Sequence, residues 1–528
     1  MVGSRSQDKA LPKQRLNWMD KNSGAKTVEQ FAESTSAVGL VNFYRSKSRV
    51  WRLIWAAALL ATWLVSGVQV WHTVRVYFNW ETGVSIRLQQ AVDRTFPAVT
   101  LCNMNPLTKS FVQHNLQLFE HVFSRQEGRK YNQTHRPSTA YKSAMLPEDK
   151  TAKRFQQTIS AEKIDLSAAG HHIEEMLIDC QMSSSECSAK DFVRWVNPVY
   201  GNCYTNFPNR EQTVTFVGPS HSLKMVLDAQ THQYIPEISS SVGFKLQVHS
   251  AEYHPFPEDF GFSIAPGSFA SVSLRESQVW RKDFPYNNKE CGTAERHFDT
   301  KNVFRTWEFW IGEGKIGSLN YTEMACTKDC YQRMLVVGCR CYDPMFTTHS
   351  QMETFRLQMN LTETPPVCNG SVRTTRKCIH GVISRIMREE ACYQQCPYPC
   401  FERLFTPRIT SSLWPEQKFF ENALERLKTK SPQVKATSIQ DARESLVKVE
   451  IFFESTHLES VVEYPKMEFW SLLANVGGVF GLYTGVCFLT ALEFVQFCVD
   501  YLNVRKKQFS RATIQSEAQF KGKGKTIS

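Results

Sequence analysis

The chain has 528 residues and a formal net charge of +11, which is too long for one simple core and predicts roughly two to four domains. Residues 1–50 carry nine Lys/Arg against four Asp/Glu (+5), and residues 503–528 carry seven against one (+6), so the middle is neutral. Basic tails beside apolar segments follow the positive-inside rule. We therefore expect both termini in the cytoplasm and no nucleic-acid partner.

The N-terminal part predicts a cytoplasmic arm followed by a first span. Residues 1–50 are polar and basic, and we expect one ordered piece near the membrane, between Phe31 and Arg45. The first apolar stretch is too long for a cleavable signal peptide. It includes the 22 residues Leu53–Val74 without Asp, Glu, Lys or Arg. We predict a first transmembrane helix over residues 51–76.

The next segment, residues 77–467, predicts an exported, disulfide-rich domain. Fourteen of the 16 cysteines lie between residues 102 and 400, and an even number in an exported region indicates disulfides. A zinc site at Cys330, Cys339 and Cys341 is the competing interpretation. Four glycosylation sequons fall in the same segment, at Asn132, Asn320, Asn360 and Asn369.

Periodicity predicts a mixed α+β domain in this segment. Residues Phe96–Leu107 predict a strand that ends at an Asn/Pro turn, and Ser110–Phe123 has helical spacing. Alternation of apolar and polar residues predicts three further strands, at Val242–Ser250, Gly267–Ser277 and Val447–Ser455. The fold class is membrane α plus extracellular α+β.

Residues 468–500 predict a second membrane helix, and residues 501–528 a cytoplasmic basic tail. Between Glu468 and Glu493 lie 24 uncharged residues, which as a helix would span about 36 Å. Gly477, Gly481 and Gly485 are four apart on one face. This stripe has two interpretations: tight helix packing, or a helix whose backbone approaches a permeating ion and breaks there.

Four stretches resemble the degenerin and epithelial sodium channel (DEG/ENaC) family. They are FPAVTLCNMN (96–105), YTEMACTKDCYQRMLVVGCRCYDPMF (321–346), CYQQCPYPCFERLF (392–405) and LLANVGGVFGLYTGVCFLTALEF (472–494). The resemblance spans roughly residues 30–500. It implies a trimer with two transmembrane helices per subunit and an ectodomain of palm strands and a helical thumb. It also implies the pairing Cys102–Cys203, Cys180–Cys187, Cys291–Cys400, Cys326–Cys396, Cys330–Cys392, Cys339–Cys378 and Cys341–Cys368.

The resemblance assigns pore roles to the second helix. Gly485, Val486 and Cys487 stand where the family has its Gly-x-Ser selectivity tract, with Cys in place of Ser. Glu493 matches a carboxylate below that tract, although a snorkelling interfacial residue is the alternative. Ala474 matches the position at which bulky side chains hold degenerin pores open.

The resemblance also suggests gating residues. Val38 and Gly39 stand where most members have His-Gly, so the turn stays possible without the imidazole. Tyr77 or Trp80 is expected to form one side of an aromatic contact between the first helix and the thumb. We expect Tyr286 to form the other side of this aromatic contact.

These features predict a sodium-preferring cation channel subunit of the plasma membrane, amiloride-sensitive and gated by an extracellular stimulus, in a homo- or heterotrimer. Its expected partners are sodium ions, the lipid bilayer and the other subunits, and the extracellular ligand stays unassigned. A purinergic receptor channel shares the topology but not the motifs. A non-conducting auxiliary subunit or receptor of the same fold is the alternative. No catalytic motif or cofactor site is evident, so we expect no enzyme.

Overall fold

The computed structural model describes most of the chain and divides it into two compact units. The described residues are 31–33, 35, 39–91, 94–123, 155–206, 213–214, 216–236, 238–297, 304, 310–311, 314–315, 319–370, 372–389, 391–430 and 434–523. Unit 1 is Met1–Gly83 with Pro465–Ser528, and unit 2 is Val84–Tyr464. Unit 2 is thus inserted between the two apolar segments of unit 1.

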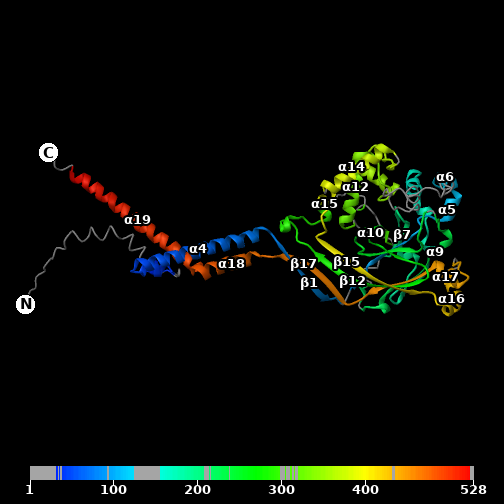
Figure 1. The fold of residues 1–528 in the computed structure, drawn as a ribbon, viewed down its shortest axis with the longest axis horizontal. Coiled ribbons are helices and arrows are strands. Elements are labelled where there is room, and N and C mark those ends of the chain that lie inside the picture. Colours follow the sequence, from blue (N-terminus) through cyan, green and yellow to red (C-terminus); the bar gives the residue numbers. More distant parts are fainter. Residues whose placement is uncertain are drawn as a thin grey trace, which may run out of the picture. The chain divides into compact units, whose positions relative to one another are not determined.

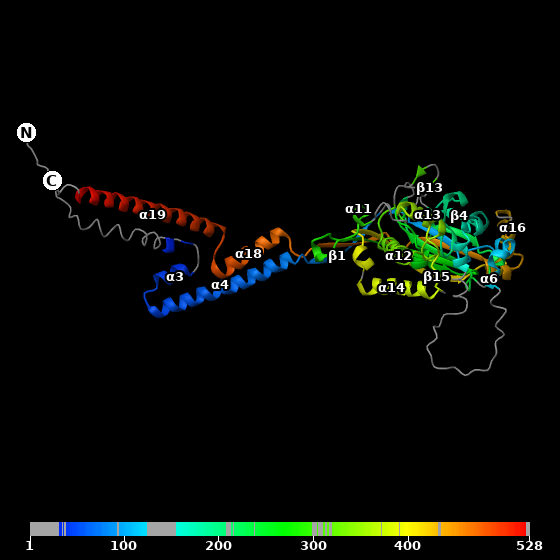
Figure 2. The same ribbon diagram turned by 90° about the horizontal axis from the view of Figure 1, so that it is seen from above.

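Unit 1 is helical. Its elements are α3 (Leu40–Arg45), α4 (Arg49–Phe78), α18 (Phe469–Thr484) and α19 (Phe488–Lys523). Helices α4 and α18 lie side by side (Figure 2), with Trp63 and Phe480 in ring contact at 6.0 Å. Among the described residues, α4 is long and apolar enough to cross a membrane. The segments Phe469–Thr484 and Phe488–Lys506 qualify only as a pair, bent by 72°.

The larger sheet of unit 2 has eight strands. Its path is β1 (Thr82–Gln90), β17 (His457–Pro465), β12 (Ser268–Trp280), β16 (Leu446–Phe453), β9 (Leu223–Asp228), β4 (Leu177–Met182) and β5 (Ser185–Glu186). Strand β15 (Phe401–Leu413) pairs antiparallel with β12 along its whole length. β16 and β17 both run parallel to β12. The chain enters on β1 and leaves on its neighbour β17, and next to them Lys466 donates to the Glu81 carboxylate at 2.7 Å.

The second sheet has five strands in the order β11 (Phe262–Ile264), β10 (Phe244–His249), β3 (Ala98–Asn103), β7 (Gly201–Asn206) and β6 (Phe192–Asn197). Every residue of β3 and β7 is buried, as expected for strands covered on both faces. One apolar core joins the two sheets, with Val272 and Ile451 from the larger and Leu101 and Phe244 from the smaller. Two-stranded pairs join β2 (Arg94–Thr95) to β8 (Thr213–Val214) and β13 (Trp310–Ile311) to β14 (Gly314–Lys315).

Helices lie around the sheets. They are α5 (Lys109–His114), α6 (Leu116–Phe123), helical residues 155–161, α8 (Leu166–Ala169), α9 (Ile173–Met176), α10 (Pro257–Phe260), α11 (Ala294–His297), α12 (Glu323–Cys339), α13 (His349–Gln358), α14 (Arg373–Glu389), α15 (Ala391–Gln395), α16 (Gln417–Lys430) and α17 (Ile439–Ser445). Short 3-10 turns are η1 (Ala189–Asp191), η2 (Pro219–His221), η3 (Thr231–Gln233) and η4 (Tyr286–Asn288). Figure 1 shows α12, α14 and α15 grouped together, away from α16 and α17.

Seven disulfides join the segments of unit 2. They are the pairs that the family resemblance implied: Cys102–Cys203, Cys180–Cys187, Cys291–Cys400, Cys326–Cys396, Cys330–Cys392, Cys339–Cys378 and Cys341–Cys368. Three of them start from α12 and reach α14, α15 or the residue after α15, which holds these helices together. Cys330, Cys339 and Cys341 are all paired, so their sulfurs are not available as thiolate ligands for zinc.

The predicted strands are confirmed with small shifts of their ends. Residues Phe96–Leu107 contain β3, and the alternating stretches correspond to β10, β12 and β16. The helical stretch Ser110–Phe123 is divided at Asn115 into α5 and α6. The second apolar segment differs more from a single helix over residues 468–500, because it stops after Thr484 and restarts at Phe488.

A chain of buried hydrogen bonds crosses the five-stranded sheet. The Trp195 indole donates to Thr205 Oγ1 at 2.9 Å, the Thr205 and Thr100 hydroxyls lie 2.8 Å apart, and Thr100 Oγ1 lies 2.8 Å from His249 Nε2. On the other side of its ring, His249 Nδ1 lies 2.9 Å from the Ser250 carbonyl. Neutral His249 fits, because Nδ1–H donates to the carbonyl while Nε2 accepts from Thr100. Burial lowers the pKa of His249 to about 4.

His171 is held in the same way. Its Nδ1 lies 2.6 Å from Gln230 Oε1, and its Nε2 lies 3.0 Å from the Asn105 amide nitrogen. Because Asn105 can only donate from that nitrogen, the ring is neutral with the proton on Nδ1. Burial lowers the pKa of His171 to about 4 against its ordinary 6.5.

These two buried histidines make the stability of the protein depend on pH. Between about pH 6.5 and pH 4 the unfolded chain binds protons that the folded chain does not, so the free energy of unfolding is highest above pH 6.5 and falls toward pH 4. Each histidine contributes up to about 1.4 kcal/mol per pH unit. We expect His249→Gln to make this dependence shallower by about one proton, measured by urea unfolding of the full-length protein with tryptophan fluorescence.

The exposed His457 supplies a matched control. His457→Gln should leave the pH dependence of unfolding unchanged. If the parent and both variants lose stability with the same slope, burial of His249 is not the cause.

Candidate functional site

The break in the second apolar segment is the most unusual backbone feature of unit 1. Helix α18 ends at Gly485, which has φ 68° and ψ 8° in the left-handed region, where glycine meets no penalty from a Cβ atom. The Gly485 N–H still donates to the Gly481 carbonyl at 3.2 Å. The chain then passes through Val486 and Cys487 before α19 begins.

Two buried threonines satisfy the N–H groups at this break. Val486 N donates to Thr484 Oγ1 at 3.3 Å, and Cys487 N donates to Thr490 Oγ1 at 3.2 Å. The Thr484 hydroxyl in turn donates to the Phe480 carbonyl at 2.7 Å. Thr490 occupies the third position of α19 and reaches back to its N-cap residue, as in half of a capping box. Both threonines are buried, with 3% and 6% of their surface exposed.

The carbonyl groups at the break differ from the N–H groups in their hydrogen bonding. Among the described residues, the carbonyl oxygens of Gly485 and Val486 accept no hydrogen bond, whereas that of Cys487 accepts from Ala491 at 3.2 Å. A free carbonyl oxygen is a ligand for hard cations such as sodium. The break therefore offers oxygens to a cation while its N–H groups are occupied.

The predicted selectivity tract coincides with this break, but the sequence did not reveal Thr484 and Thr490. Both are ordinary helix residues by pattern, because the usual capping signal is Ser or Thr at the N-cap with Glu or Gln three residues later, and here Cys487 and Thr490 hold those positions. The free thiol Cys487 is exposed and its Sγ lies 3.5 Å from Thr490 Oγ1. The second free cysteine is Cys498.

Below the break, Glu493 contacts the N-terminal arm. Thr35 Oγ1 donates to Glu493 Oε2 at 3.2 Å, and Phe31 stacks on Phe497 with ring centroids 4.5 Å apart. Val38 lies outside the described residues. Gly39 has φ 94°, and a Cβ there would lie 2.9 Å from Leu59 of α4. The glycine thus permits both the turn and the close approach to α4.

A face of small residues runs along α18 toward the break. Ala474, Gly477, Gly478 and Gly481 stand at positions i, i+3, i+4 and i+7, which share one side of a helix. Ala474 is exposed, and a Cβ added at any of the three glycines would meet nothing within 4 Å in this chain. This face is uncovered, whereas Phe480 contacts α4 through Trp63.

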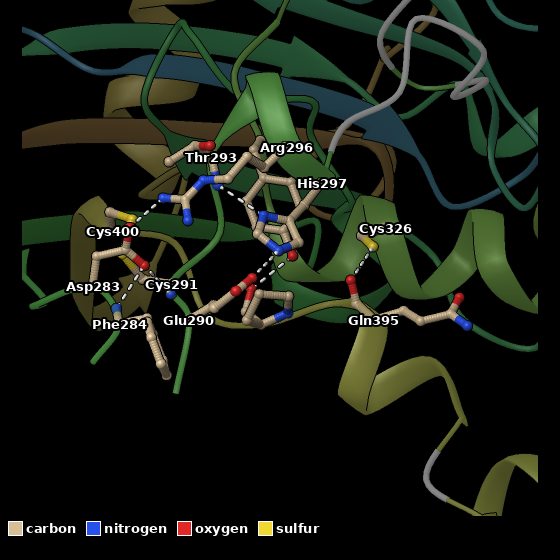
Figure 3. Close-up of polar contacts among 12 residues, drawn as sticks. Asp283, Phe284, Glu290, Cys291, Thr293, Arg296, His297, Cys326, Gln395 and Cys400 are labelled. Carbon is tan, nitrogen blue, oxygen red and sulfur yellow. Dashed lines mark hydrogen bonds and ion pairs between the residues drawn. A yellow bond between two sulfur atoms is a disulfide. The ribbon is translucent and has the colours of Figure 1, made fainter. Parts of the chain in front are cut away.

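The predicted gating aromatics fall in both units. Tyr77 and Trp80 lie together at the end of α4, with ring centroids 5.4 Å apart, and Trp80 has a positive φ of 52°. Tyr286 belongs to η4 in unit 2. The Tyr286 loop is fastened by Asp283, whose carboxylate accepts from Phe284 N at 2.9 Å and Cys291 N at 3.2 Å and is paired with Arg296 (Figure 3). The Arg296 guanidinium lowers the pKa of Asp283.

Asp283, Cys291 and Cys400 also form the one cluster of possible metal ligands among the described residues. Cys291 and Cys400 are joined in a disulfide, as Figure 3 shows, so neither offers a thiolate. The cluster is a structural staple. The sequons at Asn320, Asn360 and Asn369 are exposed, and Asn132 lies outside the described residues.

An apolar helix long enough to cross a membrane, a second apolar segment with a break, and a domain with seven disulfides are together typical of a membrane protein with a disulfide-bonded β-rich domain. Residues 31–497 match the sequence profile of the amiloride-sensitive sodium channel family. The chain belongs to this family, which is the DEG/ENaC family of the resemblance and consists of ion channels and not of enzymes.

Three relatives illustrate the similarity. The chain is 23% identical to acid-sensing ion channel 1 of Gallus gallus, over 91% of this chain and 85% of the relative. It is 22% identical to epithelial sodium channel subunit alpha of Xenopus laevis, over 91% and 82%. It is 26% identical to degenerin unc-8 of Caenorhabditis elegans, over 67% of this chain and 42% of that longer relative.

The left-handed conformation of Gly485 predicts a cost for any side chain there. We expect Gly485→Ala to destabilise the break by about 1 kcal/mol, because a Cβ atom crowds the next carbonyl at positive φ. The readout is the thermal midpoint of the detergent-purified full-length protein. Gly67→Ala in α4, where nothing lies within 4 Å, should not lower it. Equal midpoints for the two variants would contradict the assignment.

Proposed function

We propose that this chain is one subunit of a trimeric, sodium-preferring cation channel whose ion pathway passes the break between α18 and α19. Each of three subunits contributes one α18, and the small face with Ala474, Gly477 and Gly481 packs around the shared axis. The channel resides in the plasma membrane with both termini in the cytoplasm, is blocked by amiloride, and opens in response to an extracellular stimulus acting on unit 2.

The free carbonyls of Gly485 and Val486 carry this proposal. Unpaired main-chain groups are tolerated at membrane depth only where they face protein or a water-filled path. The N–H groups at the break are already occupied by threonine hydroxyls, so the polar groups left to face such a path are oxygens. That arrangement supports cation passage and opposes anion passage.

The side chains beside the break fit the same role. Three copies of Cys487 near the axis present small, weakly hydrogen-bonding thiols, which favours sodium less strongly than a serine ring. Three copies of Glu493 concentrate cations next to the break, and the hydroxyl of Thr35 holds each carboxylate. These residues replace part of the ion's hydration shell as it passes, and no covalent bond is made or broken.

The decisive measurement is expression of the chain alone under voltage clamp, in sodium and then potassium, with and without amiloride. A sodium-carrying, amiloride-sensitive current supports the proposal. Surface protein without current, even when Ala474 is replaced by a bulky residue, supports the auxiliary-subunit alternative instead.

Ala474 gives a first specific prediction. We expect Ala474→Val to raise the resting current severalfold, because a larger side chain on the uncovered small face holds three helices apart. Leu472→Val, two positions away and on the opposite, half-buried side of α18, should leave resting current near the parent level. Unchanged or reduced current in Ala474→Val at equal surface expression would show that this face does not line the closed pore.

Cys487 gives a second specific prediction. A methanethiosulfonate reagent that carries a trimethylammonium group forms a mixed disulfide with an accessible thiolate, and at Cys487 it places a fixed positive charge at the break. We expect loss of most of the current in the parent and none in Cys487→Ser, which keeps Cys498. Equal sensitivity of the two proteins, or no loss in the parent, would place the ion path away from Cys487.

A further inference from the structure

Unit 2 contains a cavity of about 790 Å³, and none of the residues given a pore or gating role above lines it. Three segments surround it: residues 156–167, strand β6 with Trp195, and residues Thr348–Gln351 at the start of α13. Its volume lies in the range of pockets that hold small molecules, about 300–1,000 Å³. The segments are up to 195 positions apart in sequence (351 − 156), so the cavity exists only in the folded domain.

Part of the wall is apolar and firmly held. Ile159 and Leu166 belong to one buried cluster, and Trp195 belongs to another beside the disulfide Cys102–Cys203. The indole of Trp195 is fixed by its hydrogen bond to Thr205, the first link in the chain that ends at His249. This wall is therefore preformed, which lowers the cost of binding an apolar group.

The remaining wall is cationic. Lys163, which has a positive φ of 54°, and Arg194 line the cavity. Among the described residues neither forms an ion pair, and the Arg194 guanidinium donates to the Ser167 carbonyl at 3.4 Å. The single lining carboxylate, Asp165, accepts from Ser167 N at 2.9 Å as the cap of α8. With His349 neutral, the lining carries two positive charges against one negative.

The start of α13 adds a favourable field for an anion. Thr348 and Gln351 form a capping box that occupies two N–H groups, and the N–H groups of the intervening residues point in the direction of the helix N-terminus. His349 and Ser350 are those residues, and both line the cavity. Lys163 and His349 line the same cavity, and burial and the charge of Lys163 lower the pKa of His349.

We propose that this cavity binds a small organic anion with one carboxylate or sulfonate on an apolar ring or chain. The charged group lies among Lys163, Arg194 and the first turn of α13, and the apolar body lies on Trp195, Ile159 and Leu166. The net lining charge of one favours a monoanion over a polyphosphate. The inference does not rest on the channel function, because its evidence comes from unit 2 alone.

An occupant of this cavity contacts three segments of unit 2. Residues 156–167 and β6 already touch, because Val196 packs on the cluster around Phe155 and Gln156 donates to the Pro198 carbonyl at 2.8 Å. The third segment, the start of α13, packs on α12 through Met352 and Phe355. A bound ligand adds contacts between these two packed regions. Binding stabilises this arrangement by RT ln(1 + c/Kd), where c is the free ligand concentration, so the stabilisation rises with the logarithm of ligand concentration above Kd.

The test uses 1-naphthaleneacetate as the probe and its neutral amide, 1-naphthaleneacetamide, as the matched control. Binding to the full-length protein in lipid nanodiscs is measured by ligand-observed NMR, with empty nanodiscs subtracted. We expect the acetate to bind at least tenfold more tightly than the amide. Lys163→Gln with Arg194→Gln should weaken acetate binding at least tenfold, whereas Lys109→Gln with Lys190→Gln, which removes two exposed charges elsewhere, should not.

A second variant guards against a folding artefact. Ser350→Glu places a carboxylate in the first turn of α13, where it favours the helix, yet it repels an anion from the cavity. We expect unchanged thermal stability and at least tenfold weaker acetate binding. Equal binding of acid and amide, or acetate binding that survives both Ser350→Glu and the Lys163/Arg194 pair, overturns the proposal. The readout is binding, so a non-conducting protein would test it equally well.

Discussion

The second apolar segment can lie in a membrane only if the main-chain N–H and carbonyl groups of three residues find hydrogen-bond partners. Between Gly485 and Cys487 the helix gives up its regular bonds, and a hydrocarbon environment offers no replacement. Thr484 and Thr490 supply acceptors for the two N–H groups, both from within the segment. Within the part of the chain that the structure describes, the Gly485 and Val486 carbonyls accept no such bond. The break therefore requires an external polar neighbour, and the uncovered small face of α18 is the side on which close neighbours fit.

Unit 2 meets a different requirement. Strands β3 and β7 are buried on both faces, and polar side chains in this interior must find hydrogen-bond partners there. The chain from Trp195 to His249 and the contacts of His171 do so with neutral rings. Disulfides tie α14 and α15, which bury little surface of their own, to the better buried α12. Packing and hydrogen bonds thus stabilise the sheets, and disulfides stabilise the helices beside them.

The sequence predicted what depends on local pattern. Alternation located β10, β12 and β16, and uncharged length located α4. The seven pairings required the family resemblance, because spacing alone permits many. The break was one of two interpretations of the glycine stripe, and the sequence could not choose between them, since the stripe fits a continuous helix equally well and the deciding contacts are threonine hydroxyls. The cavity was invisible because Lys163, Arg194 and His349 become neighbours only through folding.

The insertion of unit 2 between two segments of unit 1 has a structural corollary. The domain begins on β1 and ends on β17, which are adjacent strands of one sheet, and the residues before and after them are joined through Glu81 and Lys466. A module whose two ends lie side by side can gain loops, lose them or be exchanged whole without altering the spacing of the helices that carry it. The loops of unit 2 and the helices of unit 1 can in this way evolve independently.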